Sequence, residues 1–538
     1  MLKTYTFPKF DYRPSPVQPE GRVERVPLVV IGAGPVGLTA ALDCARRGLP
    51  VVLLDDNDTV SVGSRALCYA KRTLEVWDRL GVADRMVDKG VQWKVGKVFR
   101  GDRLVYQFDL LPEAGHRMPA MINLQQYHLE EYLVDACRAS GPVDLRWKHR
   151  VTALEQADGR VRLTVDTPDG PVPIDADWVI ACDGANSDVR KMVGAEFTGQ
   201  AFQDRFLIAD VLMKADFPTE RWFWFDPPFH RGQSVLLHRE ADNVWRIDFQ
   251  LGWGADPDEE RQPEKVIPRI QAMLGPDAEF ELEWVSVYQF ACRRIDRFRH
   301  GRVLFAGDSA HQVSPFGARG ANTGVQDVDN LAWKLALVAA GRAPESLIDT
   351  YHDERSVAAD DNIANSTRAT DFITPKSRAS RVLRDAVLEL SEHEPFARRL
   401  LNSGRLSTPT PYPASPLSTP DDAPFEGAMR PGTNAADAPV TRAGRPSWLL
   451  NELPAGFVLL AFGAKPPVAT VAWNGVAATV LSVGDDVVDV EGLAARRYDG
   501  QPGTVYLLRP DQYVAARWRA FDASRIEAAI ARACGAAA

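Results

Sequence analysis

The architecture of this chain shows first between Val26 and Gly48, where the sequence is VPLVVIGAGPVGLTAALDCARRG. The apolar run from Val26 to Ile31 predicts a buried strand. From Pro35 onward the apolar residues have helical spacing, and a basic pair precedes the closing glycine. Because a further apolar strand is predicted at 51–54, the chain opens as a β-turn-α-β unit of an α/β fold.

The turn between this strand and helix has the spacing G-x-G-x-x-G, formed by Gly32, Gly34 and Gly37. Glycines at these places permit the tight turn, let a pyrophosphate approach the backbone, and let the helix pack closely on the strand. The uncapped N–H groups and positive dipole at the helix start would bind the phosphates. Asp55, at the end of the second strand, is expected to accept a ribose hydroxyl. The pattern predicts a dinucleotide site and is compatible with both FAD and NAD.

Two later segments place an Asp and a Gly directly after predicted strands. Asp183-Gly184 follows the strand predicted at 178–182, and Gly307-Asp308 follows the strand predicted at 302–306. Taken alone, an Asp-Gly pair is most often only a turn. Their common position predicts that distant segments return to the same sheet.

A glycine-rich segment at 315–324 opens an amphipathic helix predicted at 322–339. Its notable residues are Pro315, Gly317, Gly320 and Asn322. The segment predicts a second helix N-terminus that is directed at an anion. The alternative is a loop that merely needs positive φ angles.

A middle region from about 202 to 290 is rich in Trp and Phe and alternates apolar with polar residues. The alternation predicts an antiparallel sheet that covers a substrate. The candidates to bind the substrate or to activate its hydroxyl group are His238, Arg246, Asp248, Gln250 and Tyr288. Three of them share one face of a strand, and the alternative is that this polar face meets solvent.

The composition excludes several classes of function. The 538 residues have a formal net charge of -9 and a pI near 5.6, which argues against general nucleic-acid binding. The six cysteines have no CxxC or metal-ligand spacing, so we predict neither disulfides nor a metal site. The polar start of the chain lacks the apolar core of a signal peptide, and no apolar stretch is long enough to span a membrane. We therefore expect a soluble, cytoplasmic protein.

Together, the three motifs resemble those of the FAD-dependent aromatic hydroxylases, the single-component flavoprotein monooxygenases, over residues 28–358. The resemblance implies that FAD is the cofactor, that Asp308 binds its ribityl chain, and that Pro315 lies beneath its ring. It assigns to FAD the residues Gly32, Gly34, Gly37, Asp55, Arg65, Gln126, Asp183, Gly184, Asp308, Pro315, Gly317, Gly320 and Asn322. Pro315 and His238 are the candidate catalytic residues.

The resemblance also implies the order of domains. We expect a Rossmann-like FAD-binding domain in two parts, an inserted and mostly antiparallel β substrate domain, a proline-rich linker, and a small C-terminal α/β domain. The expected ranges are 1–200 and 291–406, 201–290, 407–440 and 441–538. The last range resembles a thioredoxin-like domain without CxxC, for which assembly or stability is a better role than disulfide chemistry. A homodimer is expected.

The sequence thus predicts an FAD-dependent monooxygenase that uses NADH or NADPH and O2 to hydroxylate a small phenolic compound through a flavin hydroperoxide. Three alternatives stay open, because a fold does not fix the chemistry. One is a flavin-dependent halogenase, which residues 222–227 resemble superficially. The others are a dehydrogenating or quinone-reducing flavoenzyme and a non-catalytic FAD-binding redox sensor.

Overall fold

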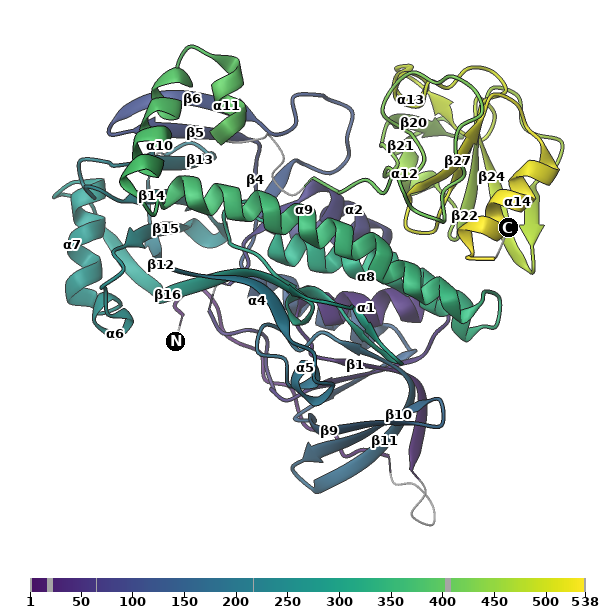
Figure 1. Cartoon of the computed structure of the whole chain (residues 1–538), viewed down its shortest axis with the longest axis horizontal. Coiled ribbons are helices and arrows are strands. Elements are labelled where there is room, and N and C mark those ends of the chain that lie inside the picture. The colour runs from purple at the N-terminus through teal and green to yellow at the C-terminus, as the bar shows by residue number, and fades with distance from the viewer. Residues whose placement is uncertain (1, 17–22, 64, 216, 402–407, 537–538) are drawn as a thin grey trace.

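The structure is a computed structural model that describes residues 2–16, 23–63, 65–215, 217–401 and 408–536. It has a mixed α/β fold with several sheets and two long helices that cross the middle of the molecule (Figure 1). Residue 407, where the predicted linker begins, lies outside the described residues. Within the described ranges, no helix combines the length and the apolar character needed to cross a lipid bilayer.

The first sheet contains the predicted dinucleotide-binding unit. Its strands are β1 Glu24–Ile31, β2 Val51–Asp55, β8 Val143–Trp147, β9 Arg150–Ala157, β10 Arg160–Thr167, β11 Gly170–Ala181, β17 Arg299–His300 and β18 Val303–Phe305. Their order is β17-β18-β11-β1-β2-β8, and the path from β18 to β8 is parallel throughout. β10 extends the sheet as an antiparallel neighbour of β11, and β9 pairs antiparallel with β10.

The central strands of this sheet are apolar on both faces because both faces are covered. Leu28, Val29 and Val30 of β1 are all fully buried, although consecutive side chains point to opposite sides. Helices that pack around this core are α1 Pro35–Arg46, α2 Lys71–Arg79, α3 Ala83–Lys89, α4 Gln126–Ala139 and α8 Gly320–Ala339. The unalternating apolar run therefore marks the middle of the sheet.

The second sheet lies beside the first. Its strands are β5 Val95–Arg100, β6 Arg103–Asp109, β12 Phe197–Met213, β13 Arg221–Phe225, β14 Ser234–Arg239, β15 Val244–Leu251, β16 Phe280–Ile295 and β19 His311–Gln312. Their order is β19-β16-β12-β15-β14-β13-β5-β6, and only β13 and β5 are parallel neighbours. One face packs against α7 Pro263–Leu274, which follows the short α6 Pro257–Glu260.

This sheet is larger than the predicted range of 201–290. β5 and β6 join it from residues 95–109, and β12 and β16 reach beyond both ends of that range. The parallel pairing of β5 with β13 joins segments that are far apart in the sequence, so no local pattern could reveal it. A third, small sheet is formed by β3 Cys68–Ala70, β4 Val91–Trp93 and β7 Met121–Asn123.

The remaining helices and the C-terminal sheets complete the fold. The helices are α5 Asp188–Met192, α9 Asp349–Ile373, α10 Arg378–Leu390, α11 Pro395–Leu401, α12 Leu449–Glu452, α13 Leu493–Tyr498 and α14 Ala523–Ala533. The strands are β20 Pro439–Arg442, β21 Arg445–Trp448, β22 Phe457–Phe462, β23 Thr470–Trp473, β24 Val476–Val483, β25 Val488–Asp489, β26 Val505–Leu508 and β27 Val514–Trp518. They form a sheet of order β23-β24-β22-β26-β27 and a smaller one of order β21-β20-β25.

The C-terminal region shares a core with the rest of the chain. Residues 408–438 form neither a helix nor a strand, yet Tyr412 and Leu417 within them are buried. Trp333 of α8 and Leu347, which follows α8, pack into the apolar cluster of the C-terminal sheet. Buried apolar contacts therefore hold the C-terminal sheet against α8.

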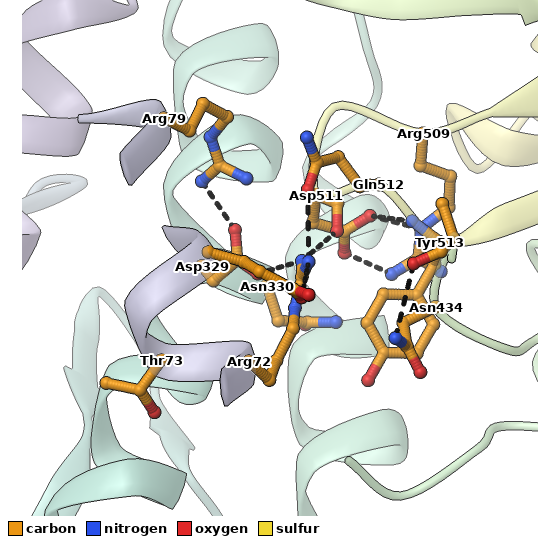
Figure 2. A network of polar contacts seen from close by, with 12 residues as sticks. Arg72, Thr73, Arg79, Asp329, Asn330, Asn434, Arg509, Asp511, Gln512 and Tyr513 are labelled. Atoms are coloured by element: carbon orange, nitrogen blue, oxygen red, sulfur yellow. Dashed lines mark hydrogen bonds and ion pairs between the residues drawn. The ribbon is translucent and has the colours of Figure 1, made fainter. Parts of the chain in front are cut away.

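A buried group of charged side chains joins the same parts of the molecule (Figure 2). Arg72 of α2 donates to the carboxylate of Asp329 in α8 (2.9 Å) and to the backbone oxygen of Asp511 (2.7 Å). Arg509 forms ion pairs with Asp511 and with Glu354 of α9, both at 2.5 Å. The turn between β26 and β27 is thus bonded to α2 and α9, and Arg72 connects it further to α8.

We predict that Glu354→Gln destabilises the protein by about 3–5 kcal/mol, because Arg509 and Lys334 would lose the carboxylate that both contact. Burial alone would raise the pKa of Glu354, but these two cations hold it well below its ordinary value. The measurement is the free energy of unfolding in urea. The control is Asp135→Asn, which breaks an exposed ion pair with Arg85 and should cost less than about 1 kcal/mol. Equal losses in the two variants would contradict the prediction.

Candidate functional site

The predicted dinucleotide motifs meet at one edge of the first sheet. Ile31 at the end of β1 pairs with Leu54 of β2 and with Ala181 of β11, and Ala181 pairs with Phe305 of β18. The glycine motif, the acid that ends β2, the Asp-Gly pair and the Gly-Asp pair therefore lie side by side. The crevice outside the carboxyl ends of parallel strands is where α/β sheets bind their ligands.

The three glycines of the first motif have different reasons to be glycine. Gly32 has φ 101°, and a Cβ atom there would lie 2.5 Å from the backbone oxygen of Cys182. A Cβ atom on Gly37 would lie 1.8 Å from the oxygen of Gly32, so helix and turn could not pack as they do. At Gly34 the nearest atom would be a side-chain oxygen of Glu130, at 3.9 Å. The backbone at Gly34 is therefore open to a close approach by a phosphate.

Asp55 holds this turn in place. One oxygen of its carboxylate accepts the N–H of Ala33 (2.6 Å), and the other accepts the N–H of Asn57 (2.8 Å). Burial raises the pKa of Asp55. The oxygen that accepts the N–H of Ala33 keeps a second lone pair, so Asp55 can also accept a ribose hydroxyl. In the part of the chain that the structure describes, no side chain caps the start of α1, whose first N–H groups face the same crevice.

The Gly-Asp pair after β18 presents the exposed carboxylate of Asp308. Gly307 has φ 67°, and its N–H donates to the Asp327 carboxylate of α8 (3.0 Å). Asp308 is exposed, and no group among the described residues hydrogen-bonds its carboxylate. Protein atoms nevertheless surround it closely enough that burial raises its pKa. Asp308 can therefore accept hydrogen bonds from a ligand that enters the crevice.

The loop before α8 is closed by its own backbone. The oxygen of the exposed Pro315 accepts the N–H groups of Gly317 (2.8 Å) and Ala318 (3.1 Å). Ala318 has φ 52°, a conformation that favours glycine. Asn322 accepts the N–H of Ala70 (2.8 Å), so its side chain ties the first turn of α8 to β3. No described side chain caps the start of α8, at Gly320, so its first N–H groups can bind an anion.

The Asp-Gly pair after β11 is held by the chain that follows it. Asp183 accepts the N–H of Val189 (3.1 Å) through one carboxylate oxygen, while its Oδ1 atom is buried and has no partner among the described residues. Gly184 has φ 76°. Arg190 donates to the backbone oxygen of Ser309 (3.4 Å), which joins this segment to the Gly-Asp turn.

Gln126 is directed into the loop that carries Arg65. Its side-chain oxygen accepts the N–H of Ala66 (2.9 Å), and its amide nitrogen donates to Ser61 (3.0 Å) and Glu130 (2.8 Å). Arg65 itself is exposed. Gln126 therefore holds the loop in place by hydrogen bonds. Of the two residues, Arg65 is the one that is accessible to a ligand.

One face of the second sheet lies against these loops. Arg246 of β15 donates to the backbone oxygen of Arg65 (3.3 Å), and Phe206 of β12 packs against Phe316 with ring centroids 4.9 Å apart. Residues paired across antiparallel strands point to the same side of the sheet. His238 pairs with Arg246, so it belongs to this face.

The structure brings the five predicted polar residues of the middle region onto this face. Gln250 and Tyr288 both pair with Phe206, and Asp248 lies between Gln250 and Arg246 in the alternation. His238 and Arg246 are only 3% and 4% exposed, and Gln250 is 9% exposed. The alternative of a polar face turned to solvent is therefore wrong. Gln250 accepts the N–H of Ser234 (3.0 Å).

Arg246 is a structural cation of this face. It donates twice to Asp210, at 2.9 and 3.1 Å, and lies 3.3 Å from a carboxylate oxygen of Glu240. Burial alone would lower the pKa of Arg246, but the two carboxylates hold it well above its ordinary value. Its guanidinium is therefore committed to these carboxylates and to the loop at Arg65.

Asp248 and His238 each have a polar side-chain atom that is not hydrogen-bonded to any described residue. The Oδ1 atom of Asp248 and the Nδ1 atom of His238 are buried and have no hydrogen-bond partner among the described residues. Burial raises the pKa of Asp248 to about 6, against the opposing charges of Arg246 and Arg221. Burial and the same two arginines lower the pKa of His238 well below its ordinary value. At neutral pH Asp248 is thus an anion and His238 is neutral.

A cavity of about 360 Å³ adjoins this face. Its aromatic wall consists of Tyr106, Phe108, Phe223, Phe225, Phe316 and Phe372. Arg221 also lines it, and the charge of Arg221 lowers the pKa of both His238 and Asp248. The cavity therefore combines aromatic side chains with charged groups, and its volume is in the size range of small-molecule sites.

Sequence reasoning missed four residues of this site. They are Glu130, Asp210, Arg221 and Phe316. Two of them left a signal: Asp210 is an acid inside an apolar strand, and Glu130 follows Gln126 by one helical turn. Arg221 and Phe316 have no local signal, because a cavity wall is assembled from distant segments.

A family model described as an FAD binding domain matches residues 25–366. The chain is 31% identical to 6-methylpretetramide 4-monooxygenase of Streptomyces rimosus over 91% of this chain and 90% of that protein. It is 29% identical to a flavin-dependent monooxygenase of Mycobacteroides abscessus, over 90% and 96% of the two chains.

The chain belongs to the FAD-dependent aromatic hydroxylase family. The predicted family and the prediction of a hydroxylating flavoenzyme are thereby confirmed. A crystal structure of the flavin-dependent monooxygenase PieE with FAD and substrate has the same fold, with a TM-score of 0.80 and 23% identity over 95% of this chain and 99% of that one.

The crevice of this hydroxylase fits FAD. A phosphate can approach Gly34, where a side chain would fill the space, and the first turn of α1 supplies unbonded N–H groups. The buried Oδ1 atom of Asp183 and the carboxylate of Asp308 have no hydrogen-bond partner among the described residues, and ribityl or ribose hydroxyls can provide one. Asp55 can bind the ribose at the other end.

We predict that Asp308→Asn weakens FAD binding to the hydroxylase by about an order of magnitude or more, because a charged acceptor of ligand hydroxyls is lost. The measurement is the dissociation constant from flavin fluorescence after reconstitution of the apoprotein. Asp158→Asn is the control, since Asp158 lies in an exposed turn between β9 and β10. If the two variants bind FAD equally well, Asp308 does not hold the cofactor.

Proposed function

We propose that this protein hydroxylates a phenolic aromatic compound with NADH or NADPH and O2. The observation that supports this most is that the aromatic cavity shares Phe316 and Arg319 with the loop before α8. That loop resembles the one beneath the flavin ring in the hydroxylase family. A compound in the cavity would therefore lie next to FAD, which, when bound and reduced, activates O2 and supplies the oxygen atom that enters the substrate.

The cavity suits an aromatic ring, because aromatic side chains form much of its lining. Phe223 and Phe225 supply one wall from the sheet, Phe316 supplies the wall toward the loop, and Phe372 of α9 lies 5.7 Å from Phe225, measured between ring centroids. Offset and edge-on contacts between such rings are favourable. A dry site protects a reactive oxygen species from decay in water.

Asp248 is our candidate to take a proton from a phenol: Leu236 pairs with both Asp248 and the cavity residue Phe223, so Asp248 stands on the sheet face that the cavity adjoins. An electrophilic oxygen needs an electron-rich ring, and loss of the hydroxyl proton makes the ring richer. The unpartnered Oδ1 atom of Asp248 can accept that proton, and a base is most effective when its pKa lies near the working pH. Its pKa of about 6 meets this condition better than the strongly lowered pKa of His238.

His238 and Arg221 then orient the hydroxyl group. The Nδ1 atom of the neutral His238 can hydrogen-bond the phenol oxygen, and the positive charge of Arg221 favours the phenolate. Arg246 acts through Asp210 and the loop at Arg65, so it is a positioning residue. Tyr288 borders the same face and is a candidate to contact the substrate.

The names of relatives agree with a phenolic substrate. The chain is 32% identical, over 63% of its length and 64% of the relative's, to a probable NADH-specific resorcinol 4-hydroxylase of Rhodococcus jostii. It is 26% identical to 3-(3-hydroxy-phenyl)propionate/3-hydroxycinnamic acid hydroxylase of Mycolicibacterium smegmatis, over 91% and 90% of the two chains. These names support the substrate class, and the first supports NADH.

A screen of substituted phenols tests the proposal. The FAD-loaded protein should oxidise NADH or NADPH faster when a suitable phenol is present, consume O2 in equal amount, and transfer one atom of isotopically labelled O2 to the product. Phenol-dependent oxidation of the nucleotide without labelled product would instead indicate the dehydrogenating or quinone-reducing alternative.

We predict that kcat/KM for hydroxylation of the phenol rises with pH through about 6 as Asp248 loses its proton. Asp248→Asn should lower kcat/KM by about 10²- to 10⁴-fold and abolish this limb of the pH profile. His238→Gln is the matched comparison, because the pKa of His238 lies well below that of Asp248. That variant should keep the limb at pH 6, and a limb that persists in Asp248→Asn would refute the role of Asp248.

A further inference from the structure

The C-terminal region holds one loop of the part of the molecule that contains the site. This loop, residues 110–120, connects β6 of the second sheet to β7 of the small sheet. Arg497 of α13 donates to the backbone oxygens of Ala114 (2.8 Å) and Gly115 (2.7 Å) in the loop. It also donates to the backbone oxygen of Asp437. One guanidinium therefore joins the loop to the segment that leads into the C-terminal sheets.

The guanidinium of Arg497 serves mainly the backbone of the loop. The Arg497 side chain is only 10% exposed, and its ion pair with the exposed Glu113 is long, at 3.7 Å. It also contacts the Nε2 atom of His116 at 3.0 Å. Arginine can only donate, so His116 accepts there. Burial, together with the charges of Lys71 and Arg497, lowers the pKa of His116 to about 4, so this acceptor is neutral at neutral pH.

Close packing as well as hydrogen bonding fits the loop to α13. Gly115 has φ 78°, and a Cβ atom there would lie 2.2 Å from the side chain of Leu493, the first residue of α13. The N–H of Arg117 donates to the carboxylate of Asp437 (3.1 Å). The side chain of Arg117 donates to Asp78 of α2 (3.0 Å). The loop is therefore held between α2 and the C-terminal region.

Both ends of the loop lead to the functional site. β6, which precedes the loop, carries Tyr106 and Phe108 of the aromatic cavity wall. Leu110 packs against the same small apolar cluster as Ala318 of the loop before α8. At the other end, the backbone oxygen of Ala120 accepts the first N–H of α2 (3.0 Å). A displacement of loop 110–120 would therefore reach the cavity wall and the loop before α8.

We propose that the C-terminal region is a clamp on loop 110–120 and that Arg497 is a positioning residue for hydroxylation. The proposal rests on the proposed function and adds a task for the C-terminal region. With the loop held, Tyr106 and Phe108 are in place before the aromatic compound binds, so binding does not have to order them. Without the clamp the ring is held less firmly, and O2 that has taken two electrons from the nucleotide ends as hydrogen peroxide instead of entering the product.

Hydrogen exchange tests the clamp itself, independently of any activity. In the FAD-loaded Arg497→Gln protein, backbone amides in residues 110–120 should exchange faster than in the unmodified protein, because the loop opens more often. Amides of β1, in the middle of the first sheet, should not change. The matched control is Arg496→Gln, since Arg496 is exposed on the same helix and donates to the backbone oxygen of Glu491 within its own region.

The positioning role is measured with the phenol that stimulates nucleotide oxidation most in the screen described above. Arg497→Gln should bind this phenol about fivefold to thirtyfold more weakly, the cost of ordering one residue of the loop, as read from flavin absorbance. It should also form less product and more hydrogen peroxide for each nucleotide oxidised. The affinity for FAD and the nucleotide oxidation without phenol should stay unchanged. Arg497→Lys should restore part of the loss, because an ammonium group can still donate to a backbone oxygen.

Leu493→Ala is the second variant, because it removes the contact with Gly115 and keeps Arg497; it should change both measurements in the same direction, and it decides the question if Arg497→Gln does not fold. Unchanged exchange in residues 110–120 would overturn the clamp. Faster exchange with unchanged phenol affinity and unchanged product yield, or with an equal loss of FAD binding, would overturn the positioning role. If no phenol gives labelled product, the proposed function fails, and hydrogen exchange still decides whether the clamp exists.

Discussion

The carboxylate of Asp327 joins the parts of the molecule on which the site depends. It is fully buried and accepts hydrogen bonds from the N–H of Gly307 (3.0 Å), from His311 (2.6 Å) and from Arg355 of α9 (2.7 Å). Burial would raise the pKa of Asp327, but His311 and Arg355 hold it below its ordinary value. One carboxylate thus fixes α8 to the Gly-Asp turn and to α9, and so sets where the start of α8 points.

The site is built where two sheets with different tasks meet. The parallel sheet supplies the cofactor crevice, because its strand ends gather backbone N–H groups and carboxylates at one edge. The second sheet supplies a buried face on which aromatic rings stand beside Asp248, His238 and Arg221. The loop before α8 contacts the second sheet, since Phe316 packs on Phe206 and lines the cavity.

Buried ion pairs near the C-terminal region also hold α8 in place. Lys334 of α8 and Arg509 share the carboxylate of Glu354, and Arg72 of α2 contacts Asp329 of α8. α8 is therefore fixed at its start by Asn322, in its middle by Asp327 and farther along by these ion pairs. A helix held at several points along its length keeps its N-terminus in place.

The sequence by itself determined the parts that depend on backbone shape and local spacing. Gly32 and Gly37 must be glycine for steric reasons, and an unbroken apolar run such as Leu28 to Val30 must be covered on both faces. These constraints act within a few residues, so the first β-turn-α-β unit and the positions of the Asp and Gly motifs could be predicted. The alternation on β15 likewise predicted that Arg246, Asp248 and Gln250 share a face.

Only the tertiary structure decided what that face meets and what each residue on it can do. Arg246 is occupied by Asp210, which stands on another strand, whereas Asp248 keeps a free oxygen and a pKa near 6. Arg221 gained its importance from a cavity whose walls come from β13, the loop before α8 and α9. The burial, the hydrogen-bond partners and the electrostatic environment of a residue depend on its neighbours in space. Those neighbours come from segments far apart along the chain, so no local sequence pattern reveals them.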